Sequence, residues 1–176
     1  MTRSTKRLFF SALTLLMIFH ASVRGQGIPD EANRLRLAQS LERSGQYEKA
    51  AKLYEDLHGK NPSNFVFFDG LHRMYVQLKE YGKAIAMVQE RLGRYPNDLN
   101  LLGTLGEDYL KAGKETEALA AWERALATDE KNQNVYRYIS NILVQNRLFS
   151  RNVEVLLRGR KNTGNPNLFA ADLGYG

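Results

Sequence analysis

A 34-residue stretch carries the clearest structural pattern in the chain: LNLLGTLGEDYLKAGKETEALAAWERALATDEKN, Leu99–Asn132. In its second half, apolar side chains recur every three or four residues, as at Ala118, Trp122 and Leu126. This spacing is typical of the buried face of an amphipathic helix. The glycine and polar residue within Ala112–Lys114 favour a turn between the two halves. The stretch therefore predicts two helices joined by a short turn.

The same pattern recurs every 34 residues along most of the chain. Rows that begin at Glu31, Phe65, Leu99, Gln133 and Asn167 align without a gap. The aligned columns are Leu37, Leu71, Leu105, Ile139 and Leu173; Leu41, Tyr75, Tyr109 and Leu143; Tyr47, Tyr81, Glu115 and Phe149; Ala50, Ala84, Ala118 and Asn152; Tyr54, Val88, Trp122 and Leu156; and Pro62, Pro96, Glu130 and Gly164. Such repetition predicts a solenoid in which successive units share one continuous core.

The rows resemble the tetratricopeptide repeat, a helix–turn–helix unit of the same length. The best row has Leu105, Gly106 and Tyr109 in its first half, and Ala118 and Trp122 in its second. The resemblance implies an all-α fold, a right-handed superhelical solenoid of antiparallel helix pairs. It also implies a partner, because proteins of this family bind another protein or a peptide.

Four full repeats are expected, at residues 31–64, 65–98, 99–132 and 133–166. The last departs most from the family pattern, since Asn152 stands in the alanine column and the proline lies at Pro166. Residues 167–176 begin a fifth repeat but supply only part of a first helix. Solenoids normally close with a polar capping helix, so we expect a truncated chain. A natural terminus with an irregular half-cap is the alternative.

Residues 1–25 are typical of a secretory signal peptide. Three basic residues precede the 12-residue apolar run LFFSALTLLMIF, residues 8–19. A membrane-spanning helix needs about 20 apolar residues, so this run fits a signal peptide better than a membrane span. Cleavage after Gly25 would leave Gln26 as the new N-terminus. We therefore expect a periplasmic or secreted protein with no transmembrane segment in the mature chain, although an uncleaved anchor or a buried first helix remains open.

Charge and cysteine content exclude several classes of protein. The formal net charge is +6, but residues 1–25 hold four basic residues and no acidic one, which leaves +2 for the remainder. A nearly neutral mature chain predicts no nucleic-acid partner. The chain has no cysteine. Disulfides, thiolate metal sites and cysteine nucleophiles are therefore excluded.

The sequence contains no recognisable catalytic, cofactor or metal motif. His58 and His72 lack the spacing of a metal-binding pair. His72 stands in a packing column, which favours a place in the core or between helices. The phosphate-binding, dinucleotide-binding and serine-hydrolase motifs are all missing. Acidic pairs such as Glu107-Asp108, with Lys111 nearby, are typical of a solvated helix. We therefore expect a protein that is not an enzyme and needs no cofactor.

By their position in the repeat, eight polar residues are expected on the concave, partner-binding face of the first helices. These are Gln39, Glu42, Asp69, Arg73, Glu107, Lys111, Arg137 and Asn141. Some family members clamp a peptide carboxylate with a basic residue followed four positions later by asparagine. Arg137 and Asn141 resemble half of such a clamp, but Asp172 stands where the next helix would need a neutral or basic residue. The clamp is therefore not assigned.

The fourth repeat is strongly basic, whereas the first three are balanced, with 15 basic and 16 acidic residues. Its basic residues are Arg137, Arg147, Arg151, Arg158, Arg160 and Lys161, against Glu154 alone. This cluster could contact an acidic partner or an anionic lipid surface. It could equally be a solvated face that acidic residues outside the four rows neutralise.

Together these patterns predict an exported, non-catalytic scaffold that binds another protein or a peptide, within an assembly of the cell envelope. The alternative is the N-terminal repeat region of a larger enzyme or sensor, whose functional domain lies beyond residue 176. A repeat fold does not by itself identify the partner.

Overall fold

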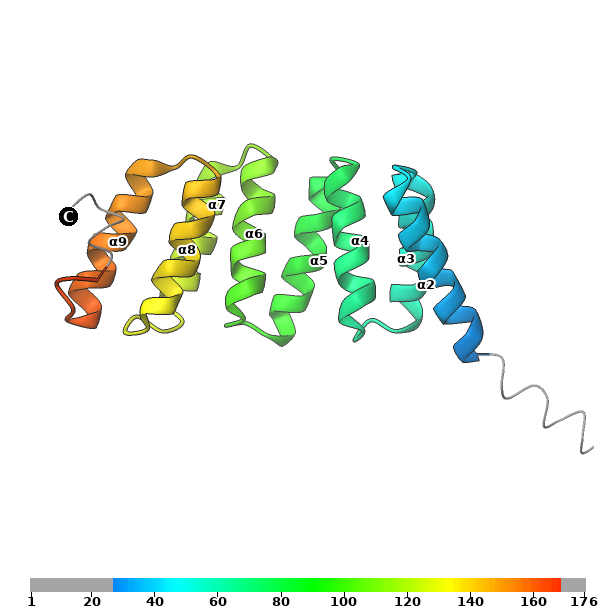
Figure 1. Cartoon of the computed structure of the whole chain (residues 1–176), viewed down its shortest axis with the longest axis horizontal. Coiled ribbons are helices and arrows are strands. Elements are labelled where there is room, and N and C mark those ends of the chain that lie inside the picture. The colour runs from blue at the N-terminus through cyan, green and yellow to red at the C-terminus, as the bar shows by residue number, and fades with distance from the viewer. Residues whose placement is uncertain (1–26, 169–176) are drawn as a thin grey trace, which may run out of the picture. The chain divides into compact units, whose positions relative to one another are not determined.

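The computed structural model describes residues 27–168, and all regular secondary structure in this range is helical. The helices are α2 (Gly27–Arg43), α3 (Tyr47–Lys60), α4 (Phe65–Gln77), α5 (Tyr81–Arg94), α6 (Leu99–Lys111), α7 (Glu115–Leu126), α8 (Gln133–Gln145) and α9 (Phe149–Thr163) (Figure 1). The predicted all-α repeat fold is confirmed. The predicted signal peptide and most of the predicted fifth repeat lie outside the described residues.

The chain divides into two compact units, with the boundary between Leu78 and Lys79. In the first unit, α3 packs against both α2 and α4. In the second unit, α6 packs against α5 and α7, and α8 packs against α7 and α9. Helices α6 and α8, the first helices of successive repeats, also contact each other. Within each unit, consecutive helices therefore pack as stacked helix–turn–helix repeats do.

The first helices α4, α6 and α8 begin at the first residue of their sequence rows. A polar residue precedes each of them: Asn64, Asp98 and Asn132. Each of these side chains accepts a hydrogen bond, 2.9–3.0 Å long, from the backbone N–H two residues later. Helix N-termini leave such N–H groups without intrahelical partners, and N-cap side chains satisfy them. The caps thus stand 34 residues apart and fix where these helices start.

The turn between the two helices of each repeat contains a residue with a left-handed backbone. The φ values are +74° at Gly45, +59° at Lys79, +75° at Gly113 and +60° at Arg147. Glycine adopts this conformation without steric cost. An L-residue with a side chain loses about 1–2 kcal/mol there, so Lys79 and Arg147 hold strained turns.

Aromatic side chains from the bulky column fill the core of each unit. Tyr54 is 0% exposed and Trp122 is 2% exposed, so the predicted burial of Trp122 is confirmed. A Cβ atom at Gly70 would lie 2.2 Å from Tyr54 Cε1, and one at Gly106 would lie 2.1 Å from Trp122 Nε1. Glycine at these two positions therefore lets the rings lie directly on the backbone of the first helix.

The column that begins with Leu37 is buried in every described member except the first. Leu71, Leu105 and Ile139 are at most 4% exposed, whereas Leu37 is 52% exposed. Leu105 and Ile139 each lie between the second helices of two successive repeats, α5 and α7 or α7 and α9. Helix α2 is the first helix of the described chain, so no described second helix precedes it to cover Leu37.

Candidate functional site

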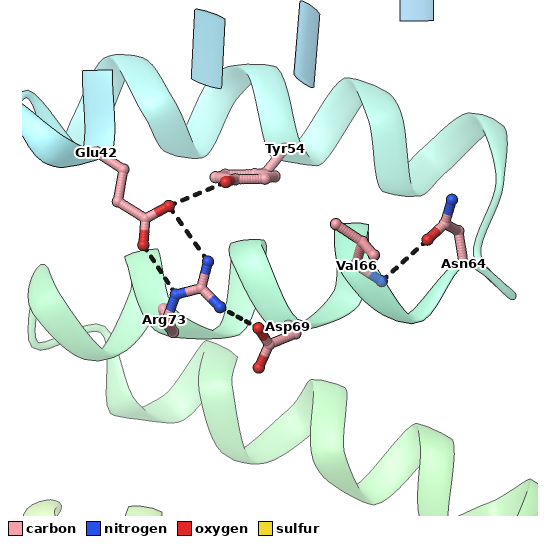
Figure 2. Close-up of polar contacts among 6 residues, drawn as sticks. All are labelled: Glu42, Tyr54, Asn64, Val66, Asp69 and Arg73. Atoms are coloured by element: carbon pink, nitrogen blue, oxygen red, sulfur yellow. Dashed lines mark hydrogen bonds and ion pairs between the residues drawn. The ribbon is translucent and has the colours of Figure 1, made fainter. Parts of the chain in front are cut away.

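Three of the eight nominated residues meet in an ionic cluster of the first unit (Figure 2). Arg73 on α4 donates from Nε to Glu42 Oε1 of α2 at 2.8 Å and from Nη2 to Glu42 Oε2 at 3.2 Å. Its third nitrogen, Nη1, pairs with Asp69 one turn earlier on α4. This two-point contact on Glu42 has the fork geometry of the stronger arginine–carboxylate pairs. The cluster ties α4 to α2, two first helices that are 31 residues apart at these positions.

Tyr54 of α3 completes the cluster, and the sequence did not identify it as a site residue. Its ring is buried against Gly70, while its hydroxyl donates to Glu42 Oε2 at 2.9 Å. The bulky column predicted only a packing role for this tyrosine. The feature of the sequence that could have indicated this polar role is the tyrosine hydroxyl, because a buried tyrosine O–H normally finds a hydrogen-bond partner.

The cluster shifts the acidity of its members in different directions. Hydrogen bonds from Arg73 hold the pKa of Glu42 below its usual range, and the bond from Tyr54 acts in the same direction. Burial, together with the carboxylate of Glu42, raises the pKa of Tyr54 to about 12. The same carboxylate raises the pKa of Arg73. Glu42 is therefore ionised and Tyr54 neutral at physiological pH. Arg73 is thus engaged within the first unit as a link between α2 and α4.

Gln39 is half-buried on α2, one turn before Glu42, and remains outside this cluster. The other four nominated residues lie in the second unit. Glu107 is half-buried and Lys111 exposed on α6, while Arg137 and Asn141 are exposed on α8. Because α6 and α8 contact each other, their exposed polar side chains can act on one surface.

Acidic residues accompany part of the basic cluster of the fourth repeat. Arg151 pairs with Glu154 at 2.8 Å, and Arg158 pairs with Glu123 of the third repeat at 2.8 Å. Arg160 donates from Nε to the backbone carbonyl of Leu168 at 2.6 Å. Arg147 and Lys161 are exposed. With five basic side chains and one acidic one, α9 and the turn before it keep an excess of positive charge.

The histidines serve as packing groups. The rings of His58 and His72 lie 6.2 Å and 6.3 Å from that of Phe68, centroid to centroid, and His72 is stacked on it. Both imidazole rings are half-buried, and Phe68 lies one turn before His72 on the same helix, α4. Among residues 27–168, no three His, Asp or Glu side chains gather in an arrangement suited to a metal ion. None of the described helices has the length and apolar character needed to cross a membrane.

Comparison with protein families identifies the repeat. The sequence profile of the tetratricopeptide repeat matches residues 35–98 and 104–166. Two curated relatives share part of the sequence: the "Protein CTR9 homolog" of Arabidopsis thaliana, 27% identical over 112 residues, and the "Tetratricopeptide repeat protein 21B" of Xenopus laevis, 32% identical over 91 residues. These matches cover 61% and 47% of this chain, but only 10% and 7% of the relatives. The aligned part is thus a small piece of each relative.

Solved structures show the same fold at low sequence identity. One is "MamA 41-end from Desulfovibrio magneticus RS-1", with a TM-score of 0.53, 14% identity and 75% of each chain covered. Another is TTC0263, a thermophilic TPR protein of Thermus thermophilus, with a TM-score of 0.50, 18% identity, and 82% of this chain and 84% of that chain covered. At these identities the similarity establishes the fold and leaves the partner open.

Proposed function

Because the chain belongs to the tetratricopeptide-repeat family, we propose that it is an exported, non-catalytic scaffold that binds another protein or a peptide in an envelope assembly. Stacked helical repeats offer an extended surface on which a polypeptide can lie. The observation that carries the proposal is the contact between α6 and α8, which presents Lys111, Arg137 and Asn141 on neighbouring first helices. These side chains can bind backbone carbonyls and carboxylates, the polar groups of a polypeptide.

Export is supported by the sequence of residues 1–25. Their basic start and short apolar run have the organisation of a secretory signal. The absence of cysteine suits an oxidising compartment, where an unpaired thiol would be a liability. N-terminal sequencing of protein recovered from the periplasmic or secreted fraction should begin near Gln26. Protein confined to the cytoplasm and still beginning at Met1 or Thr2 would refute export.

Site-specific crosslinking tests the binding function. Asn141 is replaced by the photo-crosslinking residue p-benzoylphenylalanine, and Lys131, exposed in the loop between α7 and α8, receives the same residue as the control. Irradiation in the source cells should produce a discrete crosslinked polypeptide from position 141 and little from position 131. Equal crosslinking at both positions, or none at either, would count against a partner on the first helices.

A further inference from the structure

A groove lies between the second helices α7 and α9 and is floored by the first helix α8. Its volume is about 350 Å³. Trp122 and Leu126 of α7, Ile139 and Leu143 of α8, and Val155 of α9 provide apolar walls. A volume of this size is at the lower end of the range for small-ligand sites and suits one or two large side chains. None of the eight first-helix residues predicted to bind a partner lines this groove.

Arg158 of α9 lines this groove with an unused hydrogen-bond donor. Its Nη1 donates to Glu123 of α7 at 2.8 Å. Its Nη2 is buried and has no hydrogen-bond partner within the described part of the chain. A buried donor without an acceptor costs about 1–3 kcal/mol, and more when it is charged. An acceptor oxygen on a bound segment would remove this cost, and a carboxylate is the acceptor that matches a guanidinium best.

The groove has a counterpart one repeat earlier, between α5 and α7 and floored by α6. Its volume is about 470 Å³. The two grooves use the same positions of the 34-residue repeat. Leu92, Leu105, Tyr109 and Arg124 line the earlier groove, where Leu126, Ile139, Leu143 and Arg158 line the later one. An arginine thus stands at the same place in both.

Helix α7 separates the two grooves and lines both of them. A helix with its side chains is about 10–12 Å across. A bound helix would span that width with apolar side chains seven residues apart, because each residue adds about 1.5 Å. Two aligned grooves at this separation favour a polypeptide over a small molecule that fills one of them.

The charge of α9 indicates which charge a segment bound in the groove should carry. The helix carries Arg151, Arg158, Arg160 and Lys161 against Glu154 alone. Interfaces place complementary potentials opposite each other, and this raises both specificity and the rate of association. Glu123 and Glu154 also line the groove, where they pair with Arg158 and Arg151. An occupant with apolar side chains would match the walls, and a carboxylate on it would match Arg158 Nη2 and the excess positive charge of α9.

We propose that the grooves on either side of α7 bind an acidic amphipathic segment of the partner polypeptide, with a large apolar side chain beside Trp122 and a carboxylate that accepts from Arg158 Nη2. This inference rests on the proposed function and adds a second-helix surface to it. It also names the chemistry of the partner: leucine-like or aromatic side chains seven residues apart, with aspartate or glutamate next to them.

Trp122 is the only tryptophan of the chain, so its fluorescence reports occupancy of the groove directly. The full chain is titrated with a helical peptide of about 18 residues, long enough to form a marginal helix in water. The peptide carries leucines seven residues apart with flanking glutamates, and it lacks tryptophan. A matched peptide has glutamine in place of every glutamate. The acidic peptide should shift the emission of Trp122 and bind about ten- to a hundredfold more tightly than the neutral one.

Three variants assign that preference to Arg158. Arg158→Gln should weaken acidic-peptide binding about ten- to a hundredfold and leave neutral-peptide binding unchanged. Lys161→Gln removes the same charge from the exposed surface of α9 and should change binding less than about threefold. Glu123→Gln releases Arg158 from its ion pair, so acidic-peptide binding should become tighter. Circular dichroism and urea unfolding of each variant establish that its helices remain folded.

Three outcomes would overturn the inference. The acidic and neutral peptides bind equally or not at all; Arg158→Gln and Lys161→Gln have the same effect; or vesicles containing phosphatidylglycerol shift Trp122 emission while neither peptide does. The last result would assign the basic surface of α9 to lipid. Crosslinking from position 141 is measured independently. A partner captured there without any effect of Arg158→Gln would refute the groove while the scaffold function stands.

Discussion

Replacing Gly106 by alanine tests whether the repeat core depends on contact between ring and backbone. The new Cβ atom would lie 2.1 Å from Nε1 and 2.4 Å from Cε2 of Trp122. Carbon atoms in contact are normally about 3.5–4.0 Å apart, so the indole must move by more than about 1 Å. That movement would also lengthen or break the hydrogen bond from Trp122 Nε1 to the Gly103 carbonyl, which is 3.1 Å long.

The free energy of unfolding should fall by about 1–5 kcal/mol in Gly106→Ala. Overpacking a core costs about 1–3 kcal/mol, and a buried donor that loses its acceptor costs about 1–3 kcal/mol more. The higher helix propensity of alanine returns about 1 kcal/mol. Gly82→Ala is the matched control, because Gly82 lies on α5 with no atom within 4 Å of its would-be Cβ. The control should be neutral or stabilising, by up to about 1 kcal/mol.

Urea unfolding followed by far-ultraviolet circular dichroism provides the measurement, because it also serves variants without tryptophan. A second background tests the cause. In the fourth repeat, Ser140 and Leu156 occupy the positions of Gly106 and Trp122, and both are buried there. In the Trp122→Leu background, Gly106→Ala should therefore cost little or nothing. The reasoning fails if Gly106→Ala stabilises the protein as Gly82→Ala does, or if its cost is unchanged in the Trp122→Leu background.

Three further predictions concern the ends of the helices and the ionic cluster. Asp98→Ala removes the N-cap of α6, whose carboxylate accepts two backbone N–H bonds, and should lower the free energy of unfolding in urea by about 1 kcal/mol. Arg147→Gly should raise it by up to about 1 kcal/mol, whereas Gly113→Ala should lower it by about 1–2 kcal/mol, because both residues have positive φ. Tyr54 has a pKa of about 12 when folded and about 10 when unfolded, so its contribution to stability should be present below pH 10 and disappear as the pH rises towards 12. Comparing ultraviolet absorbance titrations of the native protein and Tyr54→Phe measures this pKa, and a Tyr54 that titrates near 10 would contradict its burial beside Glu42.

The 34-residue period predicted the helices well, because the residues that determine where a helix starts lie within that helix or directly before it in the sequence. Rows that begin at Phe65, Leu99 and Gln133 coincide with helix starts, since the capping residue stands at the end of the row before. The exposure of Leu37 could not be predicted from its column. Burial in a solenoid depends on the neighbouring repeat, and α2 has no described second helix before it.

The candidate site was less predictable than the fold. The positions of Glu42, Asp69 and Arg73 within the 34-residue repeat predicted that they lie on first helices. These positions could not show that the three side chains pair with each other. Whether these side chains pair depends on their lengths and on the hydrogen bond from Tyr54 to Glu42. Tyr54 stands in the bulky column of the repeat, so the sequence predicted only a packing role for it. Arg158 was counted only as part of a basic cluster. Its unused donor became visible when the geometry placed it in a groove beside Glu123.

A calorimetric titration decides whether the chain is a polypeptide-binding scaffold. The segment crosslinked at position 141 is synthesised and titrated into the purified chain at several temperatures and salt concentrations. The scaffold proposal predicts saturable one-to-one binding with a negative heat-capacity change, because apolar surface is buried. It also predicts weaker binding at higher salt, because basic residues contribute. No binding at concentrations up to about 1 mM, where the free energy of association would be only about −4 kcal/mol, would contradict the proposal.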